Sequence, residues 1–376
     1  MAGYLFALGD AGVPADVLES RQYSTLMNIK WTSPTNGVLG DLVTMRPGDH
    51  VYFFKKRRIY GIGRVVTAPG KRCVTENFPG ATSQTTVKWS AVKKAAFMPD
   101  AHGFKKNGSK RTELVGRWVI KFEPDPAFLE ESVDMDDLLV SDPAAFRIIR
   151  DFHQRSFIKV DDVEDLAITA ALLRANPDHP LTRATGPIVL ADVFANGHEP
   201  DVPGLLAKNR SKDGSLKLEM FLEIGLLWQL ARRDTNTVDV FGEWDYLSHQ
   251  VPASPAKPSE YMDHMDVFGY RYMTGFKPIV ESYFVAELKR DVASADDVPQ
   301  IMKYVDWVRS EYAHGDYRQV KAFLVAKSFR DVTTESVGAR RDYTRGYRPA
   351  EECTWRDLTL VSYDVDEQGH ITFARV

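Results

Sequence analysis

The order of apolar segments in the second half of the chain constrains its fold more than any other feature. A helix rich in apolar residues is predicted at 216–228, and it is followed by two strands, a helix and a buried strand. A terminal hairpin closes the chain around the turn at 366–369. This order of elements predicts an α/β core. The expected ranges are strands 265–272 and 280–289, helix 296–312, strand 320–326, and hairpin strands 358–363 and 370–376.

Residues 1–125 carry a different pattern, with short strands joined by turns. Pro47 and Gly48 form a turn signal before the strand at 49–54, and residues 55–58 are the expected tip of a hairpin. The chain returns along 59–66, and a further strand is predicted at 116–122 after a long exposed loop at 90–113. Short strands and turns of this kind are typical of a small β-barrel.

The two patterns are separated by a segment of different composition. Residues 142–176 show helical apolar spacing, and helix breakers dominate 176–203. A chain of 376 residues is too long for one average domain. We therefore predict an N-terminal domain at 1–160, a helical linker at 161–212 and a C-terminal domain at 213–376.

The formal net charge of −4 hides a strong asymmetry along the chain. Residues 44–121 hold 17 Lys and Arg against 4 acids, a local excess of +13. A surface that binds a polyanion needs such an excess. The expected phosphate contacts come from the hairpin tip, the strand after it and the long loop: Lys55, Lys56, Arg57, Arg58, Arg64, Lys105 and Lys106.

Several classes of protein are excluded or disfavoured by the composition. Two distant cysteines, Cys73 and Cys353, do not make a zinc site of the Cys-rich kind, an iron–sulfur cluster or a disulfide framework. No apolar run approaches 18 residues, and the N-terminus lacks the basic region of a secretory signal. We expect a soluble cytoplasmic protein. A phosphate-binding loop of the Gly-x-x-x-x-Gly-Lys type is also missing.

Polar residues at the ends of the two central strands of the α/β core are unusually placed. Glu287 and Lys289 fall on the same face of the strand at 280–289, because side chains alternate along a strand. Burying a carboxylate and a lysine there is costly unless a function uses them. Asp266 and Glu287 are hard oxygen ligands suited to Mg²⁺ or Mn²⁺, and Lys289 is suited to orient a water or stabilise an oxyanion.

The flanking helices carry two further pairs at i,i+4 spacing. Glu219 and Glu223 share one face of the first helix, and either of them is suited to complete the site through water. Gln300 and Tyr304 share a face of the helix that follows the Glu287 strand. An ion pair on an exposed strand and ordinary helix-surface residues remain the alternative interpretation of this set.

This order of motifs resembles the PD-(D/E)XK nuclease superfamily, in particular its RecB-like members and the related mismatch-type endonuclease domain. The resemblance rests on Glu287-Leu288-Lys289-Arg290, then Gln300-x-x-x-Tyr304, then the apolar strand at 320–326, and covers about 213–330. It implies a restriction-endonuclease-like core with a mixed central sheet. The resemblance also implies the site residues. Asp266, Glu287 and Leu288 would surround the metal, and Lys289 would be the catalytic lysine. Glu223, in preference to Glu219, would be the acid of the first helix, and Gln300 and Tyr304 would form the fourth motif.

Two departures from the superfamily pattern concern the Asp266 strand. No proline precedes Asp266, and Asp263 competes for the same role. The spacing from Asp266 to Glu287 is also long, which predicts an extended hairpin around 274–276.

The N-terminal half resembles the PUA-like fold, especially its EVE-type branch. The resemblance rests on Pro47-Gly48-Asp49 with the strand after it, and on Gly61-Ile62-Gly63. It implies RNA binding, or flipping of a modified base into an aromatic pocket. Six aromatic residues are candidate walls of this pocket, although each of them is more readily explained as a core residue. They are Trp31, Tyr52, Phe54, Tyr60, Trp89 and Trp118, and Trp31 is the preferred pocket residue.

Together these expectations describe a Mg²⁺-dependent DNA endonuclease directed by a basic reader domain. A modification-dependent restriction or antiphage role follows by analogy with that architecture. A DNA-repair or RNA-processing nuclease is the first alternative, and a non-catalytic nucleic-acid-binding protein with a degenerate nuclease fold is the second. Double-strand cutting by a one-site nuclease favours a homodimer, although no helix predicts the interface.

Overall fold

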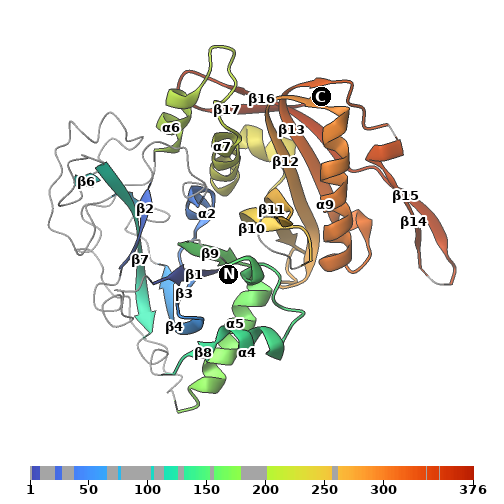
Figure 1. Ribbon diagram of the computed structural model, residues 1–376. Coiled ribbons are helices and arrows are strands. Elements are labelled where there is room, and N and C mark those ends of the chain that lie inside the picture. Colours follow the sequence, from blue (N-terminus) through green and yellow to red (C-terminus); the bar gives the residue numbers. More distant parts are fainter. Residues whose placement is uncertain are drawn as a thin grey trace. The chain divides into compact units, whose positions relative to one another are not determined.

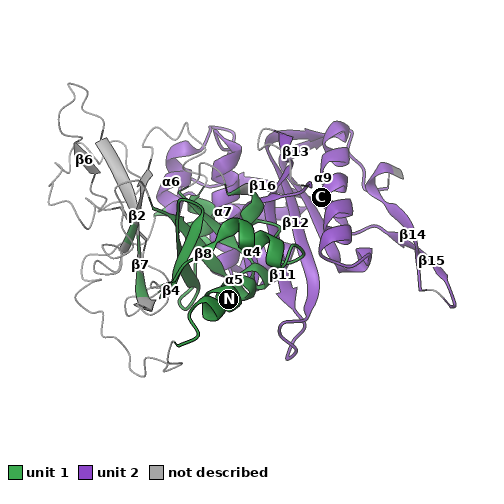
Figure 2. Cartoon of the chain, turned by 60° about the horizontal axis from the view of Figure 1, so that its bottom comes forward, with its two compact units in different colours: residues 1–201 green, residues 202–376 purple. Residues whose placement is uncertain are grey.

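A computed structural model of the chain divides into two compact units, Met1–Asp201 and Val202–Val376 (Figure 2). The boundary falls inside the segment 161–212. No helix in the described residues is both long and apolar enough to cross a membrane. The structure describes residues 2–8, 22–27, 38–65, 75–77, 103–105, 114–125, 131–152, 156–178, 201–255, 261–335, 337–346 and 348–376.

Unit 1 is built on one sheet with the strand order β2-β7-β4-β3-β1-β9. Three short strands extend this sheet: β5 and β6 pair with β7, and β8 pairs with β4. β1 and β3 are parallel, and the other described neighbours are antiparallel. A barrel requires its two end strands to pair. Among the described residues β2 does not pair with β9, so the predicted closed barrel is not found there. The strands are Gly3–Ala7 (β1), Gln22–Met27 (β2), His50–Lys55 (β3), Arg58–Val65 (β4), Thr75–Asn77 (β5), Gly103–Lys105 (β6), Leu114–Asp125 (β7), Val133–Asp134 (β8) and Phe157–Val160 (β9).

The basic hairpin predicted at 49–66 is confirmed as β3 and β4 (Figure 1). Lys55 pairs with Arg58, which leaves a two-residue turn. Both turn residues have positive φ, 49° for Lys56 and 59° for Arg57. Two-residue hairpin turns favour this conformation because it matches the twist of the strands, although Asn and Gly adopt it at lower cost than Lys and Arg.

The helical prediction for 142–176 is only partly correct. The α-helix is limited to Asp162–Ala175 (α5), and a short 3-10 turn at Ile149–Asp151 (η3) and strand β9 precede it. Strand β9 has only four residues, Phe-Ile-Lys-Val, which is too short for periodicity to distinguish a buried strand from a helix. Buried Glu164 of α5 accepts the backbone N–H of Ile149 and so caps the 3-10 turn. The other α-helices in the described part of unit 1 are Leu39–Thr44 (α2) and Met135–Ser141 (α4).

Unit 2 contains a six-stranded mixed sheet with the order β10-β11-β12-β13-β16-β17. β12, β13 and β16 run parallel, and the pairs β10–β11, β11–β12 and β16–β17 are antiparallel. The predicted α/β core with a mixed sheet is therefore confirmed. The strands are Tyr246–Pro252 (β10), His264–Tyr272 (β11), Val280–Ser294 (β12), Val320–Arg330 (β13), Leu358–Val365 (β16) and Ile371–Arg375 (β17).

Several described elements of unit 2 were not predicted. They include the helices Val202–Asn209 (α6) and Thr235–Phe241 (α8), strand β10, and a separate hairpin. The hairpin pairs Arg341–Arg345 (β14) with Glu351–Trp355 (β15) and projects away from the six-stranded sheet (Figure 1). The two predicted central helices are confirmed as Glu219–Ala231 (α7) and Val298–Glu311 (α9).

Side-chain alternation on β12 assigns the helices to the two faces of the sheet. Phe284 packs against Phe241 of α8, with ring centroids 6.0 Å apart. Tyr283 points to the opposite face and donates a hydrogen bond to the carbonyl of Tyr312, at the end of α9 (2.9 Å). Figure 1 accordingly shows α7 and α9 on either side of β12 and β13. Glu287 and Lys289 lie on the Tyr283 face, because they are an even number of residues away from it.

Candidate active site

The candidate site lies where β11 and β12 stop pairing. Their ladder ends at Val267 opposite Ala286. Beyond it the Asp266 side chain takes the place of a backbone partner, since its Oδ2 accepts the N–H of Leu288 at 2.8 Å. The N–H and C=O of a strand residue point to the same side. The carbonyl of Leu288 therefore faces the same gap as Asp266, and the structure brings these two predicted residues together.

The two central acids are both shifted toward their neutral forms. Burial raises the pKa of Asp266 to about 6, with a further contribution from the charge of Glu223. Burial and the charge of Asp266 raise the pKa of Glu287 to about 8. Glu287 is only 1% exposed, and its Oε2 has no hydrogen-bond partner among the described residues. Two buried carboxylates at one place leave negative charge uncompensated when both are ionised.

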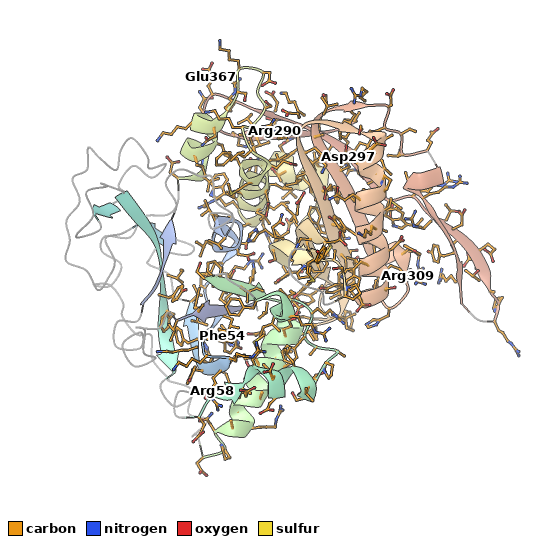
Figure 3. All side chains as sticks on the ribbon, viewed as in Figure 1. Phe54, Arg58, Arg290, Asp297, Arg309 and Glu367 are labelled. Carbon is orange, nitrogen blue, oxygen red and sulfur yellow. The ribbon has the colours of Figure 1, made fainter. Side chains whose placement is uncertain are left out.

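Lys289 lies on the same face as Glu287, as strand alternation predicted. Its Nζ is 2.7 Å from Glu287 Oε1 and 3.7 Å from Asp297 Oδ1, just before α9 (Asp297 is labelled in Figure 3). Burial lowers the pKa of Lys289, but the hydrogen bond to Glu287 and the surrounding acids raise it above its usual value. Lys289 is therefore a fixed cation beside the acids rather than a neutral base.

Helix α7 supplies a third acid from the other face of the sheet. Glu223 is buried, and its Oε1 lies 2.8 Å from Nδ1 of His249 on β10. Glu219, one turn earlier, is exposed, although it lies within the electrostatic field of Lys289 and Asp266. Of the two candidates on α7, Glu223 is thus the buried one that is linked to the central strands.

Helix α9 places Gln300 and Tyr304 together, as their i,i+4 spacing predicted. The Gln300 Nε2 donates to the Tyr304 hydroxyl at 3.0 Å. Burial raises the pKa of Tyr304, and Glu287 and Asp266 add to that shift, so the hydroxyl lies within the field of the two acids. The competing acid Asp263 instead forms an ion pair with Lys303 of α9 (2.7 Å).

Two site residues were missed because strand β10 was not predicted. His249 contacts Glu223, and Gln250 Nε2 donates to Asp266 Oδ1 at 2.9 Å. The available signal was three polar residues, Ser248, His249 and Gln250, between apolar residues at 246–252.

The donor set fits a hard divalent cation supported by few protein ligands. No group of three or more His, Cys, Asp or Glu side chains in the described part of the chain is arranged to hold a metal ion. Mg²⁺ commonly takes only one or two carboxylates and completes its shell with waters and substrate phosphate. Asp266 and Glu287 supply two such carboxylates, and the unpartnered Glu287 Oε2 is a buried acceptor that a cation would satisfy.

The predicted nucleic-acid contacts belong to unit 1 and are only partly described. Arg57 is exposed and paired with Asp136, and Arg58 donates to Ser132 (2.6 Å). Lys56 and Arg64 are exposed, and Lys55 is half-buried. Trp31, Lys106, Trp89 and the side chains of Lys105 and Trp118 lie outside the described residues.

Of the candidate pocket walls, Tyr52 belongs to the core. It is fully buried, and its hydroxyl donates to Asp165 at 2.7 Å. Phe54 and Tyr60 are half-buried on the basic hairpin.

A pH dependence follows from the raised pKa of Glu287. The folded protein keeps a proton on this carboxyl that the unfolded chain releases, so the unfolding free energy falls as pH rises from about 4.5 to about 8. The Glu287→Gln variant should show a weaker decline over that range in metal-free buffer. Glu164 in unit 1 has a similarly raised pKa and is unchanged in the variant, so its contribution cancels in the difference between the two denaturation curves, which reports Glu287 together with its interaction with Asp266. Parallel curves would contradict the prediction.

Comparisons with known proteins add little to this geometry. No protein-family model matches the chain, and no curated protein matches it. Among solved structures, the chain is similar to the crystal structure of a repair endonuclease from Pyrococcus abyssi. The two are 14% identical, the match covers 82% of this chain and 91% of that one, and the TM-score is 0.15. A similarity this weak establishes neither a fold nor an activity.

Proposed function

We propose that the chain is a metal-dependent nuclease that hydrolyses phosphodiester bonds in DNA. The observation that carries this proposal is the grouping of Asp266, Glu287 and Lys289 at the point where β11 and β12 separate. The group contains two acids with raised pKa values, a buried carboxylate oxygen without a hydrogen-bond partner, and a fixed lysine. Burying these groups lowers the stability of the fold, so a structural role alone does not explain them.

The chemistry of each side chain suits it to a different role in the proposed hydrolysis. Asp266, Glu287 and the Leu288 carbonyl would hold Mg²⁺ or Mn²⁺, which when bound lowers the pKa of water and offsets charge on a phosphate. Lys289 remains protonated beside Glu287, and so is suited to stabilise the charge that develops on phosphate oxygens. Glu223 from α7, and Gln300 with Tyr304 from α9, border the same acids and are proposed to position water or substrate around them.

The architecture proposed for unit 2 is the restriction-endonuclease-like core. The order α7, α8, β10, β11, β12, α9, β13 places an acid on the first of these helices, an acid on the second strand and the Glu-x-Lys sequence on the third. For unit 1, we propose a PUA-like or EVE-like reader that uses its basic hairpin and Trp31. The acting form is proposed to be a homodimer when both DNA strands are cut.

The biological role that suits a reader joined to a nuclease is modification-dependent restriction or antiphage defence. The test is cleavage of phage DNA that contains modified cytosine, beside unmodified DNA of the same sequence, with Mg²⁺. Cutting of the modified DNA alone is the expected result. Equal cutting of both would leave the nuclease but remove the modification reader, and would favour the repair alternative. Binding of both without metal-dependent cleavage would favour a non-catalytic binding protein.

The strained hairpin turn gives a separate prediction for unit 1. Lys56 and Arg57 hold positive φ, which costs about 1–2 kcal/mol for each ordinary L-residue. Replacing them with Asn and Gly should raise stability by about 1 kcal/mol or more and weaken DNA binding. Binding measured over a salt series should lose about 0.9 from its logarithmic slope for each phosphate contact removed. Unchanged affinity and slope would show that the turn does not bind DNA.

A further inference from the structure

Gln250 is placed in the site by an irregularity of strand β10. His249 pairs with Val267 and Val251 pairs with Met265, so Gln250 is left out of the ladder opposite Asp266. Its φ is +48°, in the left-handed region that residues other than Gly, Asn and Asp rarely adopt. Backbone strain of this kind is retained mainly where the surroundings or a function require it.

The carboxamide of Gln250 bridges two acids from different elements. Its Nε2 lies 2.9 Å from Asp266 Oδ1 and 3.4 Å from Glu223 Oε2. An amide nitrogen carries two hydrogens and ionised carboxylates only accept, so both hydrogens face the acids. Asp266 Oδ2 is already taken by the Leu288 N–H. One amide hydrogen of Gln250 therefore faces the other oxygen, Oδ1, so that each oxygen of Asp266 already accepts a hydrogen bond.

We propose that Gln250 is a positioning residue that holds Asp266 and Glu223 in the cation-free protein and weakens the binding of a divalent cation to Asp266. The inference rests on the proposed function, because it takes the site to bind such a cation. Positively polarised amide hydrogens and a cation repel each other at a shared oxygen. The Gln250 amide thus keeps the acids in place at the cost of cation affinity.

The test is Mn²⁺ binding to the full chain, followed by the electron paramagnetic resonance signal of free Mn²⁺ at constant pH. Gln250→Met keeps the length of the side chain and removes both donors. Losing a hydrogen bond to a charged group should tighten Mn²⁺ binding roughly tenfold. Gln250→Asn, which tolerates positive φ better but shortens the reach by one methylene, should also bind more tightly. Gln368→Met, at the exposed turn before β17, is the matched control and should bind like wild type.

The outcomes separate this inference from the proposed function. Wild-type binding that is lost in Glu287→Gln, together with tighter binding by both Gln250 variants, supports both. Unchanged or weaker binding by the Gln250 variants overturns the inference alone, since weaker binding would make Gln250 a ligand. Failure of wild type to bind Mn²⁺, or equal binding by Glu287→Gln, contradicts the cation site and overturns the inference with it.

Discussion

Replacing Lys289 with methionine is expected to slow Mg²⁺-dependent DNA cleavage by about 10²- to 10³-fold. The ammonium group is fixed by Glu287 at 2.7 Å and by Asp297 at 3.7 Å, and it stays charged. A preorganised charge of this kind acts on the transition state far more than on the bound substrate. Single-turnover cleavage at saturating enzyme measures the effect on the chemical step without the contribution of DNA binding.

Lys321→Met is the matched control for this experiment. Lys321 lies on the neighbouring strand β13 and is also ion-paired, with Asp357 at 2.6 Å. Its replacement removes a paired lysine from the same sheet and should leave the rate within about twofold, since surface ion pairs contribute little. A Lys289→Met enzyme that cuts as fast as this control would rule out a catalytic role for Lys289.

Truncation of Phe284 to alanine is expected to lower the unfolding free energy of unit 2 by about 3–5 kcal/mol. Phe284 is fully buried on β12, three residues before Glu287. Its ring centroid lies 5.1 Å from those of Trp244 and Phe323 and 6.0 Å from that of Phe241. Removal of the ring leaves a cavity between the sheet and α8 that surrounding rings fill only in part.

Hydrogen exchange at the β12 amides is the suitable measurement, because a chain of two units need not unfold in one step. Phe276→Ala is the control: this phenylalanine is 61% exposed in the connection between β11 and β12. Its truncation should change the exchange free energy by less than about 0.5 kcal/mol. Equal losses in the two variants would contradict the packing described for the sheet.

The sequence predicted most of the long periodic elements of unit 2. Helix α7 and strands β11, β12, β13 and β16 carry strong apolar patterns, and the short strand β17 was predicted from the turn signal before it. Strand β10 and helix α8 are seven residues each, too short for periodicity to identify. In unit 1 the local hairpin was predictable, whereas closure of a barrel depends on pairing between strands far apart in sequence.

The candidate site shows the same division between local and non-local information. Strand alternation alone placed Glu287 beside Lys289, and helix spacing placed Gln300 beside Tyr304. The contribution of Gln250 was not predictable, because it depends on a left-handed backbone conformation inside a strand. The separation of β11 from β12, which brings Asp266 to the Leu288 N–H, likewise depends on tertiary structure.

The central claim is that Asp266, Glu287 and Lys289 form a metal-dependent site for phosphodiester cleavage. The most direct test is incubation of modified and unmodified plasmid DNA with wild type and with Glu287→Gln, each in Mg²⁺ and in EDTA. The account predicts cleavage by wild type in Mg²⁺ and by no other combination. Cleavage in EDTA, equal cleavage by Glu287→Gln, or no cleavage of either DNA by wild type in Mg²⁺ would contradict it.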